Sequence, residues 1–181
     1  PIAALYITPL RSLNRDLLER LIWWCNELGL DIGVRHSDTT AYERKLQAEF
    51  PMHLLILTPE TLQAILPGKK MKKHLANVKF VIIDELHELV DSKRGVQLAI
   101  GLERLRELAG EFQIIGLSAT IGSPDEVAKF LSLNKEIEII KVHFPKEFEI
   151  KVISPQLKES DKKIATKIFS SVETSARLRE I

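Results

Sequence analysis

The sequence has few of the residues that build disulfide frameworks, membrane spans or glycine-rich phosphate loops. Its 181 residues include one cysteine, Cys25, so no internal disulfide can form and a buried thiol is expected. No apolar run approaches the roughly 18 residues of a membrane helix, and no stretch has the pattern of a signal peptide. The eight glycines are scattered singly, and none belongs to a Gly-x-x-x-x-Gly-Lys-Ser/Thr loop. We therefore expect a cytoplasmic protein that does not associate with membranes.

The sequence also lacks an excess of charge of either sign. Lys and Arg number 26 and Asp and Glu number 25, so bulk charge provides no attraction to nucleic acid. Hydrophobic residues make up 45%, which suits one α/β domain with an ordinary core. The densest basic run, Lys69 to Lys73, contains no aromatic residues, and we interpret it as a solvated helix face rather than a stacking site.

Short apolar runs alternate with helical patterns along most of the chain. The runs predict strands at residues 2–7, 31–35, 53–57, 79–84, 112–117 and 137–142. Helical spacing is clearest in Leu10, Leu13, Leu17, Leu21, Trp24 and Leu28, which precede Gly29. This alternation predicts an α/β fold with a mostly parallel sheet and helices on both faces. Residues 143–159 are expected to be a linker, and residues 160–181 an amphipathic helix.

Two adjacent carboxylates and a histidine follow the apolar run Val81–Ile83. Open parallel sheets bind ligands beyond the carboxyl ends of their strands. Asp84 is therefore a candidate ligand for Mg²⁺, and Glu85 a candidate base that deprotonates an attacking water. The alternative is a structural role in which Asp84 caps the next helix. A lone histidine such as His87 is more often a hydrogen-bonded loop residue than a metal ligand.

Four other predicted strands end in turns with hydroxyl side chains or prolines. The helices after Thr8-Pro9 and Thr58-Pro59 begin with free N–H groups that can meet a backbone phosphate. Capping accounts for Thr58 equally well, and both roles can hold at once. Arg11 is either a phosphate contact or a solvated helix residue. For the polar loop His36–Thr40, we expect helix capping.

The turn Ser118-Ala119-Thr120 follows the predicted strand at residues 112–117. Its two hydroxyls and small central residue suit a closely packed turn that exchanges hydrogen bonds when a neighbouring phosphate site changes. The tripeptide alone has little specificity, because Ser and Thr occur in turns everywhere.

Taken in order, these stretches resemble the motifs of a known family. Asp84-Glu85-Leu86-His87 resembles the DExH form of the Walker B motif, and Ser118-Ala119-Thr120 resembles helicase motif III. The run Thr8 to Leu13 is similar to motif Ia, and Thr58-Pro59-Glu60 to a later nucleic-acid motif. Order and spacing resemble the first RecA-like domain of a superfamily 2 helicase. Ser92-Lys93-Arg94-Gly95 narrows the resemblance to the large helicase-related (Lhr) family.

The resemblance implies an ATP-dependent nucleic-acid helicase or translocase with ATP and Mg²⁺ as cofactors. It implies that Asp84 holds Mg²⁺, that Glu85 is the hydrolytic base, and that His87 couples the ATP site to motif III with Ser118 and Thr120. It further implies contacts to a single-stranded DNA or RNA backbone from Thr8, Pro9, Arg11, Thr58 and Glu60. The alternatives are a non-catalytic nucleic-acid-binding or interaction module, and an ATPase that remodels nucleoprotein without unwinding.

The resemblance also implies how the chain is organised. Residues 1–142 are expected to be a partial first RecA-like domain whose P-loop lies upstream of Pro1, and residues 160–181 to begin a second RecA-like domain, its partner in the same protein. Without a P-loop, the isolated chain is expected to hydrolyse no ATP. The strand at residues 112–117 is expected to have an unpaired apolar edge, so that either the isolated chain self-associates or this edge pairs with another segment.

Overall fold

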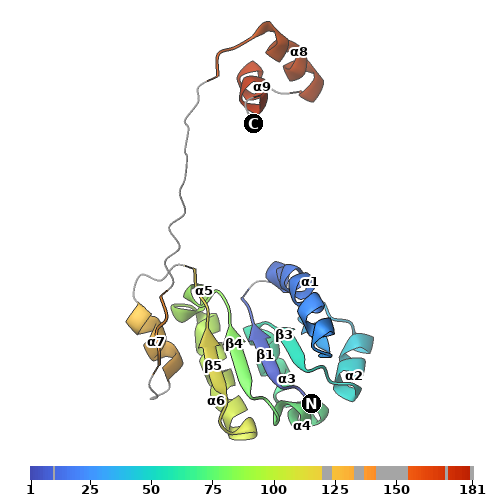
Figure 1. Cartoon of the computed structure of the whole chain (residues 1–181), viewed down its shortest axis with the longest axis vertical. Helices are drawn as coiled ribbons and strands as arrows, with labels where there is room; N and C mark the ends of the chain where they lie inside the picture. Colours follow the sequence, from blue (N-terminus) through green and yellow to red (C-terminus); the bar gives the residue numbers. More distant parts are fainter. Residues whose placement is uncertain (10, 120–123, 133–136, 142–154, 170, 180–181) are drawn as a thin grey trace. The chain divides into compact units, whose positions relative to one another are not determined.

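A computed structural model of the chain shows a parallel sheet flanked by helices, and a pair of helices near the C-terminus (Figure 1). The structure describes residues 1–9, 11–119, 124–132, 137–141, 155–169 and 171–179. Its contacts divide the chain into two units, Pro1–Ile140 and Lys141–Ile181. Of the helices in these described ranges, none combines the length and apolarity needed to cross a membrane.

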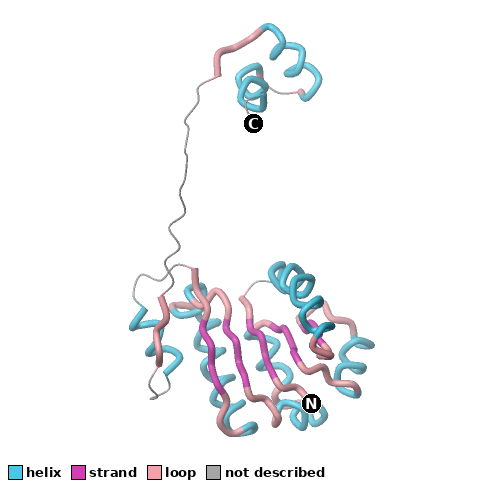
Figure 2. The backbone as a smooth tube through the Cα atoms, in the orientation of Figure 1, coloured by secondary structure: helices cyan, strands magenta, loops and turns pink. Residues whose placement is uncertain are grey.

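The described part of the first unit contains a sheet of five parallel strands (Figure 2). The strands are β1 (Ala4–Ile7), β2 (Ile32–Arg35), β3 (Leu54–Leu57), β4 (Phe80–Ile83) and β5 (Gln113–Gly116). They lie in the order β2-β3-β1-β4-β5. Ile7 pairs with Leu57 on one side and Ile83 on the other, so the three central strands end level with one another. The predicted fold class is confirmed.

Helices cover both faces of this sheet. They are α1 (Arg11–Glu27), α2 (Ala41–Glu49), α3 (Pro59–Ile65), α4 (Lys69–Leu75), α5 (His87–Val90), α6 (Lys93–Ala109) and α7 (Pro124–Ser132). The larger core packs one face of the sheet against α3, α4, α5 and α6. On the other face, Tyr6 and Ile56 pack against Leu18 and Leu21 of α1. The lysine run forms α4, which buries only Met71 and Leu75, as a solvated face predicts.

The core-facing side of α1 differs from the predicted stripe. Leu21 packs against the sheet, but Trp24 is 58% exposed and Leu28 is 68% exposed. Leu18 and the buried Cys25 take their places. Leu18 and Cys25 have the same helical spacing as Leu17 and Trp24, but each lies one position further along the chain. Apolar residues occur on both sides of α1, so the periodicity did not show which side faces the sheet. Leu10 and the side chains of Leu13 and Leu17 lie outside the described residues.

The strand predicted at residues 137–142 is wrong for the part that the structure describes. Residues 137–141 form no strand, and Val142 lies outside the described residues. Ile139 is 40% exposed and Ile140 is 77% exposed. A β-branched run becomes a strand by packing against neighbouring strands, and no described strand pairs with this one.

The helix predicted at residues 160–181 is two helices, α8 (Glu159–Ile168) and α9 (Val172–Arg179). Phe169 ends α8 in the left-handed conformation, with φ of 50°. The Ser171 hydroxyl then accepts a hydrogen bond from the Thr174 N–H at 3.1 Å and begins α9. The apolar spacing continues across this break, which is why the pattern concealed it.

Candidate functional site

The carboxyl end of β4 holds the Asp84 carboxylate in one orientation. The Asp84 N–H donates to the Ile7 carbonyl at 2.8 Å, which extends the pairing with β1 by one residue. The Tyr6 hydroxyl donates to Asp84 Oδ2 at 2.8 Å, and the Glu85 N–H donates to Oδ1 at 2.9 Å. Burial raises the pKa of Tyr6, and the hydrogen bond to Asp84 raises it further. Both Asp84 oxygens therefore have a fixed donor. Asp84 does not cap α5, which begins after Leu86 with no side-chain cap.

A single oriented carboxylate suits a magnesium ion that arrives with phosphates. Mg²⁺ keeps several waters and binds one or two protein carboxylates together with substrate phosphates. Within the described ranges, no group of three or more His, Cys, Asp or Glu side chains is placed to hold a metal ion by itself. Asp84 therefore fits a site in which one protein carboxylate binds Mg²⁺ together with substrate phosphates.

Glu85, His87 and Ser118 form a contact chain between the turns after β4 and β5. His87 Nδ1 lies 3.4 Å from Glu85 Oε2 and 2.9 Å from Ser118 Oγ. The Leu86 N–H donates to the Leu117 carbonyl at 3.0 Å, which holds the two turns together. Glu85 has a φ of 47°, a left-handed conformation that costs a non-glycine residue on the order of 1–3 kcal/mol. Thr120, predicted to belong with Ser118, lies outside the described residues.

The turns after β1 and β3 are joined by a hydrogen bond from the Thr8 N–H to the Leu57 carbonyl at 3.0 Å. Thr58 caps α3, since its hydroxyl accepts from the Thr61 N–H at 3.4 Å and lies 3.0 Å from the Thr61 hydroxyl. Thr8 is fully buried, and its Oγ1 has no hydrogen-bond partner. Arg11 is the first residue of α1, and its side chain lies outside the described residues.

The Glu60 carboxylate is bound by Arg94, 34 residues further along the chain. Arg94 Nε donates to Oε1, and Nη2 donates to Oε2 at 3.0 Å. This bidentate pair lowers the pKa of Glu60 and raises the pKa of Arg94. A carboxylate by itself repels phosphate, and in this structure the Glu60 carboxylate has Arg94 as its partner.

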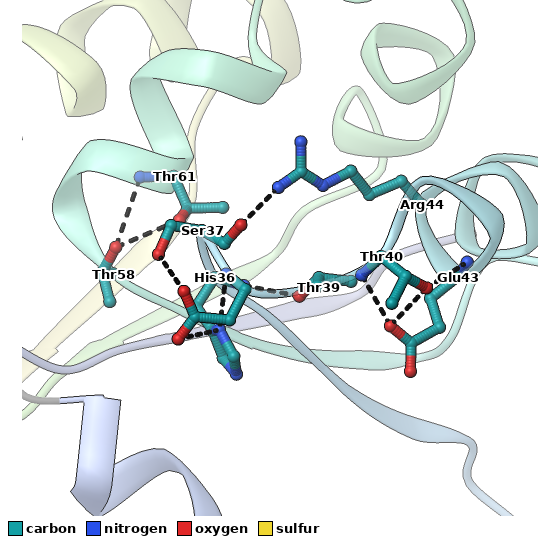
Figure 3. A network of polar contacts seen from close by, with 9 residues as sticks. His36, Ser37, Thr39, Thr40, Glu43, Arg44, Thr58 and Thr61 are labelled. Atoms are coloured by element: carbon teal, nitrogen blue, oxygen red, sulfur yellow. Dashed lines mark hydrogen bonds and ion pairs between the residues drawn. The ribbon is translucent and has the colours of Figure 1, made fainter.

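A cavity of about 830 Å³ opens at the carboxyl ends of β1, β2 and β3. Its charged lining residues are Arg35, Arg44, Arg94 and Glu60, and Pro9 and Thr58 also line it. The loop after β2 shapes one side of the cavity (Figure 3). There the His36 N–H donates to the Thr39 hydroxyl at 2.9 Å, and Thr40 forms a capping box with Glu43. The capping role predicted for this loop is confirmed.

Sequence reasoning missed Arg35 and Arg44 as candidate site residues. Arg35 ends a short strand, and Arg44 lies in the first turns of α2, so neither belongs to a motif with local spacing. They share the cavity with Thr58 because β2 lies beside β3 in the sheet. The signal that could have found Arg35 was its position as a basic residue at the carboxyl end of a predicted parallel strand, where such sheets bind ligands.

The sheet order and the acidic pair at the end of β4 define the class of a RecA-like helicase domain. The chain belongs to the DEAD/DEAH box helicase family, whose model matches residues 1–129. It is 43% identical over 163 residues to the ATP-dependent helicase Lhr-Core of Saccharolobus solfataricus, covering 84% of this chain and 19% of that protein. It is 45% identical over 165 residues to the ATP-dependent helicase Lhr-Core of Sulfolobus acidocaldarius, covering 85% of this chain and 19% of that protein.

A solved structure shares this arrangement. The Mycobacterium smegmatis helicase Lhr, bound to single-stranded DNA and AMP-PNP, aligns with a TM-score of 0.73 and 31% identity. The alignment covers 93% of this chain and 25% of that one. The predicted resemblance to Lhr helicases is confirmed, and the chain spans about a fifth of the length of the curated relatives, 19% in both.

Proposed function

We propose that the chain is part of an ATP-dependent nucleic-acid helicase or translocase of the Lhr type. In this proposal it contributes the acids of Mg-ATP hydrolysis and part of the surface that binds a single-strand backbone. The observation that carries the proposal is the fixed Asp84 carboxylate beside the Glu85–His87–Ser118 contact chain. Family membership and the named activities of the Lhr relatives support it.

Phosphoryl transfer needs positioning and charge stabilisation more than covalent chemistry from the protein. Mg²⁺, when bound, would supply charge neutralisation for the phosphates. Asp84 would hold it through a carboxylate whose orientation is fixed by the Tyr6 hydroxyl and the Glu85 N–H. Glu85 orients the attacking water and accepts its proton. In the absence of a P-loop within these 181 residues, the isolated chain hydrolyses no ATP.

His87 connects hydrolysis with nucleic-acid binding in this proposal. Its Nδ1 contacts both the base Glu85 and Ser118 in the turn after β5. A change in the phosphate site at Glu85 therefore alters the hydrogen bond that holds Ser118. The strained φ of Glu85 supports this role, because such conformations cluster at sites that switch.

The nucleic-acid surface consists of Thr8, Pro9, Arg11 and the Thr58 turn at the same edge of the sheet. The strand-bound Lhr and a second DNA-bound relative, the DUF1998 helicase MrfA with AMPPNP, support a nucleic-acid partner. Contacts to backbone phosphates make binding largely independent of sequence. Arg11→Ala is therefore expected to weaken binding to unrelated oligonucleotides alike and to leave basal ATPase intact.

The test of the hydrolytic role uses the complete protein that carries this chain. Glu85→Gln is expected to slow ATP hydrolysis by about 10²–10⁴-fold while nucleotide binding persists, because it removes the base and not the phosphate contacts. Asp84→Asn is expected to weaken Mg²⁺-dependent turnover. Glu107→Gln on the exposed side of α6 is the matched control. Equal loss of nucleotide affinity in both site variants points to damaged structure and contradicts the assignment.

A remodelling ATPase that does not unwind is the second candidate, because the described site contains hydrolytic and strand-binding elements but no strand-separating one. A strand-separation assay decides between the two. ATP turnover without separation of a tailed duplex favours remodelling, whereas turnover together with separation supports the helicase.

A further inference from the structure

A groove of about 490 Å³ lies between α4 and the last turn of α6. We call it the α4–α6 groove, and it is lined by Lys69, Lys72, Lys73, Ala76 and Leu108. It lies at the edge of the sheet where strands begin, because α4 leads into β4 and α6 leads into β5 (Figure 1). Asp84 and Thr58 follow the opposite ends of their strands. The groove is therefore separate from the surfaces proposed above for the nucleotide and the single strand.

Helix α4 has two different faces. Met71 and Leu75 are four residues apart, and both are buried in the core. Lys69 and the other lining residues of α4 have the helical spacing i, i+3 and i+4, which the C-cap Ala76 continues at i+7. These lining residues are exposed. The sequence thus places three amines on the side of the helix that lines the groove.

Among the described residues, the amines of the groove have no anionic partner. No carboxylate lines the groove, and none forms an ion pair with Lys69, Lys72 or Lys73. Lys70, on the same helix but outside the groove, pairs with Glu49 at 3.4 Å. The helix dipole accounts for Lys72 and Lys73, which lie in the last turn. It does not account for Lys69 at the first position, where a cation is unfavourable.

The rest of the groove lining is apolar. Leu108 is half-buried and packs against the core, and Ala76 leaves space beside it. The aliphatic stems of the lysines add apolar surface below their charged ends. None of the lining residues is aromatic, so the bases of a nucleic acid have no ring to stack on. A ligand that fits the groove therefore combines an apolar side chain with several negative charges around it.

We propose that the α4–α6 groove binds an acidic segment of a partner protein, in which carboxylates flank an apolar side chain. The carboxylates pair with the three lysines, and the apolar side chain covers Leu108. Charge complementarity sets the orientation of the segment, and the apolar contact adds affinity. Separate carboxylates suit lysine, because each ammonium is a compact point charge rather than a planar fork. A partner bound here does not compete for the proposed ATP and single-strand sites.

The test is peptide binding by the complete protein that carries this chain, measured by fluorescence polarisation. The probe is a fluorescein-labelled Glu-Glu-Glu-Leu-Phe-Glu-Glu-Glu peptide, and a second peptide has Ser-Ser in place of Leu-Phe. Lys69→Gln and Lys72→Gln are each expected to weaken binding of the probe by about two- to fivefold. Ala76→Gln fills the apolar part of the groove and is expected to reduce the affinity for the probe to that for the Ser-Ser peptide. Lys70→Gln removes the same charge from the same helix outside the groove and is the matched control.

Each outcome supports or overturns the docking site. Weaker probe binding by the groove variants but not by Lys70→Gln supports it. Equal weakening by Lys70→Gln overturns it, because general charge attraction then accounts for binding, and so does equal affinity for the two peptides. An unaltered protein that binds neither peptide overturns it too, including the case in which another segment of the same protein fills the groove.

Two further measurements separate the docking site from other roles. If the groove variants weaken binding of a double-stranded oligonucleotide and no peptide binds, the lysines belong to a nucleic-acid surface and the docking site is overturned. ATP turnover tests the proposed function independently. It is expected to be the same in the lysine variants and the unaltered protein, because the groove lies at the opposite end of β4 from Asp84.

Discussion

Gly95, at the start of α6, has no room for a side chain. A Cβ added there would lie 2.0 Å from the Leu89 carbonyl oxygen and 2.9 Å from its carbon. Ordinary carbon–oxygen contacts lie at about 3.3–3.6 Å, so α5 and α6 must separate by about 1.3 Å to admit a methyl group. The same carbonyl oxygen accepts from the Ser92 hydroxyl at 2.9 Å and the Ser92 N–H at 3.0 Å. Gly95→Ala therefore disturbs both hydrogen bonds.

The expected cost of Gly95→Ala follows from these contacts. Overpacking costs about 1–3 kcal/mol, and two weakened hydrogen bonds add about 1 kcal/mol each, against a gain of about 1 kcal/mol in helix propensity. A net loss of about 2–4 kcal/mol lowers the melting temperature of a chain of this size by about 4–16 °C. Thermal unfolding of the 181-residue chain, followed by circular dichroism, measures this shift.

Gly101→Ala is the matched control in the same helix. Its Cβ would lie 3.0 Å from Gln63 Nε2 and from Leu62 Cδ2, which are side-chain ends and not backbone atoms. Their movement and the gain in helix propensity should offset each other within about 1 kcal/mol. Equal melting temperatures for Gly95→Ala and the unaltered chain would refute the reasoning, because they would show that the α5–α6 junction yields without cost.

Three further predictions concern the edge strand, the Glu60–Arg94 pair and Ser118. Within the described sheet β5 is an edge strand, and Ile115 is 37% exposed, so the isolated chain should self-associate. Ile115→Lys should reduce this self-association, as measured by sedimentation velocity. An unaltered chain that stays monomeric contradicts the prediction. Arg94 lowers the pKa of Glu60 in the folded state. The ion pair therefore stabilises the fold above pH 4.5, the ordinary pKa of glutamate, and this stabilisation is lost as the pH falls through the lowered pKa. The stability difference from Glu60→Gln should shrink in acid denaturation curves, and a constant difference argues against the pair. Ser118→Ala in the complete protein should reduce nucleic-acid-stimulated ATPase more than basal ATPase, and equal reduction would remove the coupling role.

Features set by local sequence were predictable. The β3 strand and the Thr58 cap follow from an apolar run, a threonine and a proline within a few residues, and the structure reproduces both. The Asp84–Glu85 pair was placed at a strand end for the same reason. The phase of α1 and the break at Phe169 escaped prediction, because periodicity does not show which of two apolar stripes the sheet accepts or where a residue turns left-handed.

Contacts between distant residues depended on the order of the strands. Glu60 and Arg94 are joined because α3 packs along α6, and nothing in either local sequence specifies that packing. The arginine partner of Glu60 could therefore not be predicted from the Thr58-Pro59-Glu60 motif. That Arg35 Nη1 has no hydrogen-bond partner among the described residues is likewise visible only when the residues around the end of β2 are known.

Strand β1 belongs to both candidate sites. Tyr6 of this strand holds the Asp84 carboxylate, and three residues later Pro9 lines the cavity with the arginines. The strand is paired on both sides, with β3 and β4, so any change in its position alters Asp84 and the cavity together. We therefore expect substitutions within β1 to affect the proposed hydrolysis and the proposed strand binding together. Variants in the turns after β3 and β4 are expected to separate them, because Thr58 and Glu85 follow strands that lie on opposite sides of β1.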